Sequence, residues 1–112
     1  MTAARVGRVH DRESFLALRR AGRRGRSDGV SATWCPATDG SVRLALAVNR
    51  AVGGAVVRNR LRRQLRAAFG GLAAQVPPGT YLLGGGSSAV GLAPEVLRSH
   101  LHEALVRAGA GA

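Results

Sequence analysis

Lysine is absent from this chain of 112 residues, which has 17 arginines instead. Acidic residues are few, six in all, and the formal net charge at pH 7 is +11. A compact domain with this charge repels itself unless it meets an acidic partner. Nucleic acid is the default partner, and the anionic surface of a membrane is the main alternative.

Long apolar runs are also missing. No stretch approaches the ~20 apolar residues that a membrane-spanning helix needs. The first ten residues hold two arginines and lack the apolar segment of a secretory signal peptide. Cys35 is the only cysteine, which rules out a disulfide framework and fits a reducing compartment. These absences predict a soluble, cytoplasmic protein.

The length predicts a single domain over residues 1–112 with one modest core. Apolar periodicity, caps and breakers predict six elements in chain order: a helix over 13–21, a strand over 30–35, a strand over 42–48, a helix from 55, a strand over 80–84 and a helix from 94 to about 108. Between the first two elements, the arginine-rich segment 22–29 is expected to be an exposed loop. Asp39-Gly40 predicts a hairpin that pairs the first two strands, and Gly70-Gly71 is expected to end the second helix. The fold class is therefore α+β, a sandwich of helices on a small sheet.

The second helix carries the chain's main functional signal. Between Asn49 and Phe69 lie six arginines and no acidic residue. An apolar stripe follows helical spacing and is expected to face the core: Val57, Leu61, Leu65, Ala68 and Phe69. At about 100° per residue, the rest of the circumference presents a fan of arginines around Asn59: Arg58, Arg60, Arg62, Arg63 and Arg66.

Repulsion within this fan costs the isolated helix about 1–2 kcal/mol. A polyanion docked on the same face would convert that cost into binding energy. Guanidinium groups hold phosphate oxygens bidentately, and the pair Gly53-Gly54 leaves the backbone N–H groups of the helix start accessible to a phosphate. A membrane surface fits poorly, because an interfacial helix needs large apolar and aromatic residues toward lipid. The helix is therefore interpreted as a phosphate-binding element.

Catalytic candidates are scarce. The six acidic residues are scattered without a pair at general acid–base spacing, and His100 and His102 are two apart where a metal pair would be four apart. Cys35 has no evident base partner and is interpreted as a small buried apolar residue. The GGGSS run at 84–88 lacks the GK[ST] ending of a phosphate loop and is interpreted as a flexible turn.

Two aromatic residues leave a choice open. Trp34 and Phe15 could stack on unpaired bases or could belong to the core. For Trp34 the core interpretation is at least as good, whereas for Phe15 base stacking is favoured because of the resemblance described next.

Residues 50–66 closely resemble the protein subunit of bacterial ribonuclease P, whose pattern is a strand, a basic residue and then G-x-A-V-x-R-N-R-x-[KR]-R-x-[ILQ]-R. The matching residues are Arg50, Gly53, Ala55, Val56, Arg58, Asn59, Arg60, Arg62, Arg63 and Arg66. The other predicted elements follow the order and lengths of that family over nearly the whole chain.

This resemblance implies a sandwich like a domain of a small-subunit ribosomal protein, with a rare left-handed strand–helix–strand crossover. It implies that the arginine helix, with Arg50 and Gly53, binds the catalytic RNA, and that a cleft beside the first helix holds the 5′ leader of precursor tRNA. Phe15, Arg19 and Thr33 align with that cleft. No residue of the protein is expected to be catalytic and no metal ligand is assigned to it, because the resemblance implies that the RNA, with the Mg²⁺ that it mainly holds, performs the hydrolysis that matures tRNA.

The chain departs from the family pattern at several positions. Ala51 replaces a second basic residue after Arg50, Gly54 replaces an asparagine, and Gly86 stands where an arginine is usual. Arg19 and Thr33 stand where the cleft often has aromatic residues, so leader affinity is expected to depend more on charge than on stacking. Two other functions suit the charge: a ribosomal or RNA-chaperone protein, and, less well, a duplex-DNA binder, which would need arginines aligned on one leading face of the helix.

Overall fold

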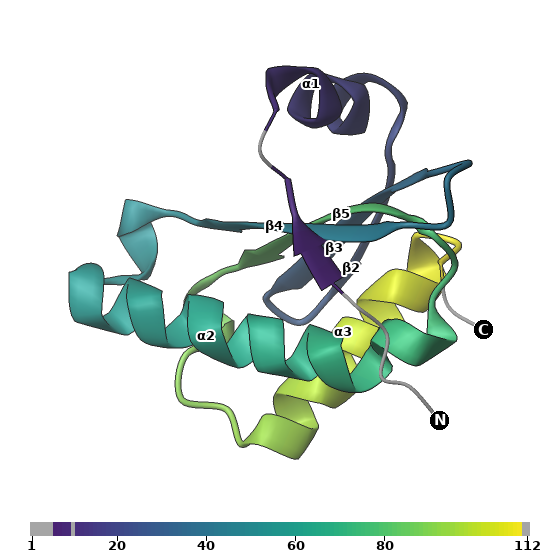
Figure 1. Cartoon of the computed structure of the whole chain (residues 1–112). Coiled ribbons are helices and arrows are strands. Elements are labelled where there is room, and N and C mark those ends of the chain that lie inside the picture. The colour runs from purple at the N-terminus through teal and green to yellow at the C-terminus, as the bar shows by residue number, and fades with distance from the viewer. Residues whose placement is uncertain (1–5, 10, 111–112) are drawn as a thin grey trace.

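Over residues 6–9 and 11–110, which the computed structural model describes, the chain forms three α-helices and five β-strands (Figure 1). The helices are α1 (Arg12–Ala21), α2 (Ala55–Leu72) and α3 (Pro94–Arg107). The strands are β1 (Val6–Arg8), β2 (Arg23–Ser27), β3 (Val30–Pro36), β4 (Val42–Val48) and β5 (Gly79–Gly85). Short 3₁₀ turns lie at η1 (Arg50–Val52), η2 (Ala73–Gln75) and η3 (Ser87–Ala89).

The strands form one mixed sheet in the order β1-β4-β5-β3-β2. α2 and α3 cover one face of the sheet and α1 lies over the other (Figure 1). β4 and β5 are parallel neighbours joined through α2. With β1 at the front of Figure 1, the chain leaves β4, passes below the sheet as α2 and returns behind β4 as β5, which is a left-handed path. The α+β class and the unusual crossover are therefore confirmed.

The predicted hairpin between residues 30–35 and 42–48 is wrong. β5 lies between β3 and β4, antiparallel to the first and parallel to the second. The turn itself forms, because Asp39 Oδ1 accepts a hydrogen bond from Ser41 N at 3.0 Å. The carbonyl oxygen of Ser41 then accepts from Gly79 N at 2.8 Å, at the start of β5. β5 carries no charged side chain and so belongs in the middle of the sheet.

The segment 22–29 is not a loop. Its residues Arg23–Ser27 form β2, an edge strand antiparallel to β3. Gly25 and Ser27 are buried, while the three arginines of the strand, Arg23, Arg24 and Arg26, are exposed. An edge strand tolerates such charges and uses them to avoid pairing with other chains, which explains why composition alone suggested a loop. β1 was not predicted either.

α2 continues beyond its predicted end at Gly70-Gly71. The helix runs through both glycines to Leu72, because Leu72 and Ala73 are buried and the glycines lie on the exposed side. α3 starts with Pro94 at its first turn, as predicted, and Gly109 follows its end with φ of +84°. The apolar side chain of Val96, in the first turn of α3, is 42% exposed.

The core lies between the sheet and the α2–α3 layer. Tyr81 is fully buried, and its ring lies between Trp34, at a centroid distance of 6.3 Å, and Phe69, at 5.1 Å. Along α2 the apolar stripe Leu61, Leu65, Ala68 and Phe69 is buried as predicted, and Val57 is half-buried. One edge of α2 is thereby fixed against the sheet, and the opposite edge carries the arginines.

Candidate nucleic-acid interface

The arginines of α2 face solvent without acidic partners. Arg60, Arg63 and Arg66 are exposed, and Arg58 and Arg62 are half-buried. The ion pairs among the described residues involve other cations: Arg43, His100 and Arg107. All six acidic residues lie in the described part of the chain. The positive face of α2 is therefore not neutralised within the protein.

Two details orient this face. Arg62 Nη1 donates to Asn59 Oδ1 at 2.8 Å, so the asparagine holds a guanidinium in place. The Nε atom of Arg58 is buried and, within the described chain, has no hydrogen-bond partner. A buried donor without a partner costs about 1–3 kcal/mol.

The backbone before α2 forms a tight corner. Asn49 Oδ1 accepts from Ala51 N at 2.6 Å and caps η1, which carries Arg50. Gly53 has φ of +154°, and a Cβ atom there would lie 3.1 Å from Val57. That conformation is essentially confined to glycine. The N-cap residue Gly54 supplies no side-chain acceptor, so no N-cap side chain occupies the first N–H groups of α2.

A groove of about 710 Å³ lies between α1 and the open face of the sheet. Its lining runs from α1 across β2, β3 and β5 to the end of β4: Leu18, Arg19, Gly22, Arg24, Arg26, Gly29, Val30, Ser31, Thr33, Ala47, Asn49, Leu82, Gly84, Gly85 and Gly86. Because Asn49 belongs both to this lining and to the cap of η1, the groove opens next to the start of α2.

The three residues aligned with the family's cleft do not lie together. Arg19 and Thr33 line the groove. Phe15 is 38% exposed and lines a separate hollow with Arg12, Leu16 and Arg19. Arg19 thus borders both spaces, and Phe15 lies beside the groove instead of within its lining.

Arg24 and Arg26 also line the groove, and sequence reasoning missed both. The alternation of residues 23–27, with arginines at 24 and 26 and small residues at 25 and 27, was the signal that could have identified them. The segment's high charge led instead to the prediction of a loop.

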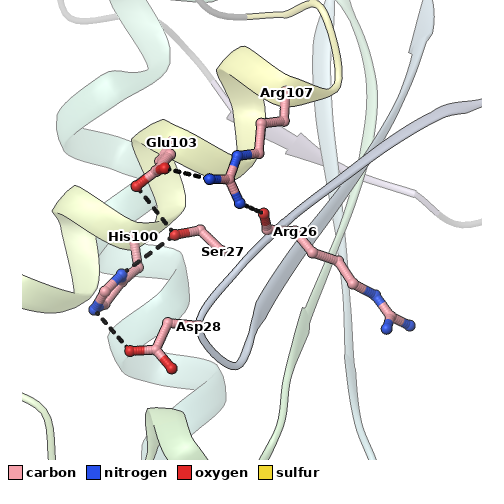
Figure 2. Close-up of polar contacts among 6 residues, drawn as sticks. All are labelled: Arg26, Ser27, Asp28, His100, Glu103 and Arg107. Atoms are coloured by element: carbon pink, nitrogen blue, oxygen red, sulfur yellow. Dashed lines mark hydrogen bonds and ion pairs between the residues drawn. The ribbon is translucent and has the colours of Figure 1, made fainter.

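A cluster of polar side chains joins β2 to α3, on the face of the sheet opposite the groove (Figure 2). Ser27 Oγ donates to Glu103 Oε2 at 3.2 Å and lies 3.3 Å from His100 Nδ1. Arg107 joins Glu103 to the backbone of Arg26, and His100 Nε2 lies 3.6 Å from Asp28 Oδ2. The spacing of His100 and His102 argued only against a metal pair, and the structure shows that His100 takes part in fixing β2 to α3.

The other residues considered as functional candidates belong to the core or to regular elements of the fold. Trp34 is 8% exposed within the core, so the core interpretation is confirmed. Cys35 is half-buried on the neighbouring position of β3. The GGGSS run is divided between the end of β5 and the 3₁₀ turn η3.

A family model for ribonuclease P matches residues 4–109 of the chain. The chain belongs to the ribonuclease P protein family. The ribonuclease P protein component of Clavibacter michiganensis is 38% identical over 82 residues, which cover 71% of this chain and 72% of that protein. The component of Thermus thermophilus is 47% identical over 53 residues, which cover 47% of this chain and 31% of that protein.

Solved structures of ribonuclease P proteins share the fold. The protein from Staphylococcus aureus superposes with a TM-score of 0.81 at 18% identity, covering 94% of this chain and 97% of that one. The protein from Thermotoga maritima gives 0.74 at 21% identity, covering 84% and 90%. Family membership gives this chain a role in the 5′ processing of tRNA, as an accessory subunit of the endoribonuclease ribonuclease P.

Two further findings concern the described residues only. In that part of the chain no three His, Cys, Asp or Glu side chains gather where they could hold a metal ion. None of its helices is long and apolar enough to cross a membrane.

Proposed function

We propose that residues 1–112 act as one RNA-binding domain that docks on the catalytic RNA of ribonuclease P through α2 and holds the 5′ leader of precursor tRNA in the groove. Mg²⁺ is held mainly by the RNA, which performs the hydrolysis. The lone Cys35 supports a cytoplasmic place of action, since thiols without disulfide partners suit a reducing compartment.

The observation that carries this proposal is the unneutralised face of α2. Five guanidinium groups occupy one helix surface, with no acidic side chain paired to them among the described residues. The RNA backbone supplies the missing negative charge and accepts bidentate hydrogen bonds. The assigned contacts are Arg50, Gly53, Arg58, Asn59, Arg60, Arg62, Arg63 and Arg66.

The groove is suited to a single strand. It runs between α1 and the sheet and opens beside the start of α2, so a strand within it would be continuous with RNA docked on that helix. Arg19 offers a guanidinium to the strand and Thr33 a hydroxyl. Phe15, in the neighbouring hollow, would stack on a base that leaves the groove.

Reconstitution tests the proposal. The chain, mixed with a bacterial ribonuclease P RNA at low Mg²⁺, is expected to restore cleavage of precursor tRNA at the mature 5′ end. The RNA alone at the same Mg²⁺ and the protein alone serve as controls. Failure to stimulate cleavage, with intact binding of unrelated RNAs, would support a ribosomal or RNA-chaperone protein and overturn the proposal.

A further inference from the structure

β2 presents two arginines to the groove in a fixed spacing. Arg24 and Arg26 alternate with Gly25 and Ser27 along the strand, and the latter two are buried toward α3. A Cβ atom on Gly25 would overlap the backbone of Ala104, so the strand cannot turn over. Figure 2 shows the Arg26 side chain pointing away from α3.

The guanidinium groups of Arg24, Arg26 and Arg19 make no hydrogen bond or ion pair to the described residues. Two residues along a strand are about 6.6 Å apart, which is close to the separation of consecutive phosphates in an extended single strand. Arg24 and Arg26 can therefore each face one phosphate of the same strand, and Arg19 can approach from α1.

The groove also lacks side chains on which unpaired bases could stack. Its lining contains neither an aromatic nor an acidic side chain, and stacking on aromatic rings is the main sequence-tolerant grip on unpaired bases. Two strands away from β2 in the same sheet, at and just after the end of β5, the lining includes three consecutive glycines, Gly84, Gly85 and Gly86. Small residues there leave room for a sugar–phosphate backbone without supplying side chains that select a base.

Protection of an edge strand is the simpler explanation for charges on β2. It accounts for charge on either face of the strand. It is sufficient for Arg23, the third arginine of β2, which lies on the face of the sheet that packs against α3, with its side chain against Gly109. Edge protection alone does not explain why the two remaining arginines share the face that lines the groove.

We propose that Arg24 and Arg26 are the residues that set leader recognition in this protein, by holding two phosphates of the leader and leaving its bases unread. The inference rests on the proposed function, in which the groove holds the leader. It makes the enzyme indifferent to leader sequence, because phosphate contacts position a strand without reporting its bases.

The test uses the reconstituted holoenzyme and measures the affinity ratio between precursor tRNA and mature tRNA, which isolates the leader's contribution. Leaders of poly(U), poly(A) and an abasic sugar–phosphate chain are compared. The poly(U) and poly(A) leaders are expected to give the same ratio within about twofold, and the abasic leader is expected to lose only what stacking on Phe15 contributes, so that in a Phe15→Ala variant all three ratios agree within about twofold. In that variant, a ratio that collapses for the abasic leader would overturn the proposal, because the hold on the leader would then depend on its bases.

Substitutions test which residues hold the leader. Arg24→Ala/Arg26→Ala is expected to lower the ratio by roughly tenfold to a hundredfold, as for the loss of one or two charge-assisted contacts. Arg23→Ala/Arg98→Ala removes the same charge outside the groove lining and is expected to leave the ratio unchanged. Arg24→Lys/Arg26→Lys keeps the charge without the bidentate geometry and is expected to fall between them. It also provides a measurement if the alanine variant unfolds.

Two failures can be told apart. If the holoenzyme processes precursor tRNA and prefers it over mature tRNA, but the Arg24/Arg26 variants retain that preference, only the inference is overturned. If the wild-type holoenzyme shows no preference for the precursor, the groove does not hold a leader and the proposed role of the groove fails as well.

Discussion

Arg107, in the last turn of α3, donates through Nη1 to the carbonyl oxygen of Arg26 at 2.6 Å and through Nη2 to Glu103 Oε1 at 2.6 Å (Figure 2). A helix on one face of the sheet is thereby tied to the backbone of the edge strand whose Arg24 and Arg26 line the groove on the other face. The rigidity of the groove wall thus depends on α3.

Removal of this tie should loosen β2. Arg107→Ala is expected to lower the free energy of unfolding by only about 1 kcal/mol, because the ion pair to Glu103 is half-exposed and screened. Amide hydrogen exchange in β2 should nevertheless accelerate more than exchange in β4 and β5. His102→Ala, on the exposed side of α3, is the matched control. Unchanged protection of β2 in Arg107→Ala would show that the tie is dispensable.

Tyr81 should make the fold sensitive to alkali. Its hydroxyl donates to the Pro77 carbonyl at 2.5 Å, and burial raises the pKa of Tyr81. Its raised folded pKa contributes stability that is complete below about pH 10, the unfolded value, and is lost as pH rises above it. Because Tyr81 is the only tyrosine, tyrosinate absorbance reports this residue alone.

The expected result is no tyrosinate signal from the folded protein near pH 10, and a free energy of unfolding that declines at higher pH. Tyr81→Phe should lose about 1 kcal/mol at neutral pH and lack the part of the alkaline decline due to this group. Tyrosinate absorbance that rises in the folded protein at about pH 10 would contradict the burial argument.

Asp11 should make the start of α1 sensitive to acid. Its carboxylate caps the helix by accepting from Ser14 N at 3.0 Å, and the side-chain and backbone hydrogen bonds from Ser14 lower the pKa of Asp11. A lowered folded pKa contributes stability that is present above the unfolded value of about 3.9 and is lost as pH falls through the folded value.

Asp11→Ala should therefore accelerate exchange of the Ser14 amide at neutral pH, and in the wild type the same loss of protection should appear only when the pH falls below about 3.9, through the lowered pKa of Asp11. Glu13→Gln, in the same helical turn but outside the cap, should leave that amide protected. Equal exchange rates in Asp11→Ala and the wild type would show that the cap does not hold α1.

The buried and the exposed side of α2 should contribute very differently to the stability of the fold. Leu65 is fully buried, so Leu65→Ala is expected to cost about 2–5 kcal/mol in the free energy of unfolding. Val56 is 74% exposed, and Val56→Ala should change stability by no more than about 0.5 kcal/mol. Chemical denaturation measures both. Comparable destabilisation by the two variants would refute the assigned orientation of α2.

The α2 helix could be predicted from sequence because its pattern is local. The spacing of Leu61, Leu65 and Phe69 fixes which edge is buried, and the arginines necessarily occupy the rest. Its end could not be predicted, since the buried positions of Leu72 and Ala73 outweigh the tendency of Gly70-Gly71 to stop a helix.

The order of strands depends on contacts that are distant in sequence. Asp39-Gly40 does form a turn, yet β5, which begins at Gly79, takes the place between β3 and β4. For the same reason, only some of the residues that line the groove could be predicted from the sequence. Arg19 and Thr33 came from the family resemblance, whereas Arg24 and Arg26 become groove residues only once β2 is paired with β3.

The central claim is that the arginine edge of α2 binds the phosphate backbone of an RNA. The most direct measurement is the salt dependence of affinity for ribonuclease P RNA, compared between the wild type, Arg58→Ala/Arg60→Ala and Arg23→Ala/Arg98→Ala. With about five arginines on phosphates, log K should fall with log salt at a slope of roughly −3 to −4. The α2 variant should bind more weakly with a slope flatter by about 1.5, while keeping the wild-type fold, and the control should match the wild type. An α2 variant that binds as tightly as the wild type, with the same slope, would contradict the claim.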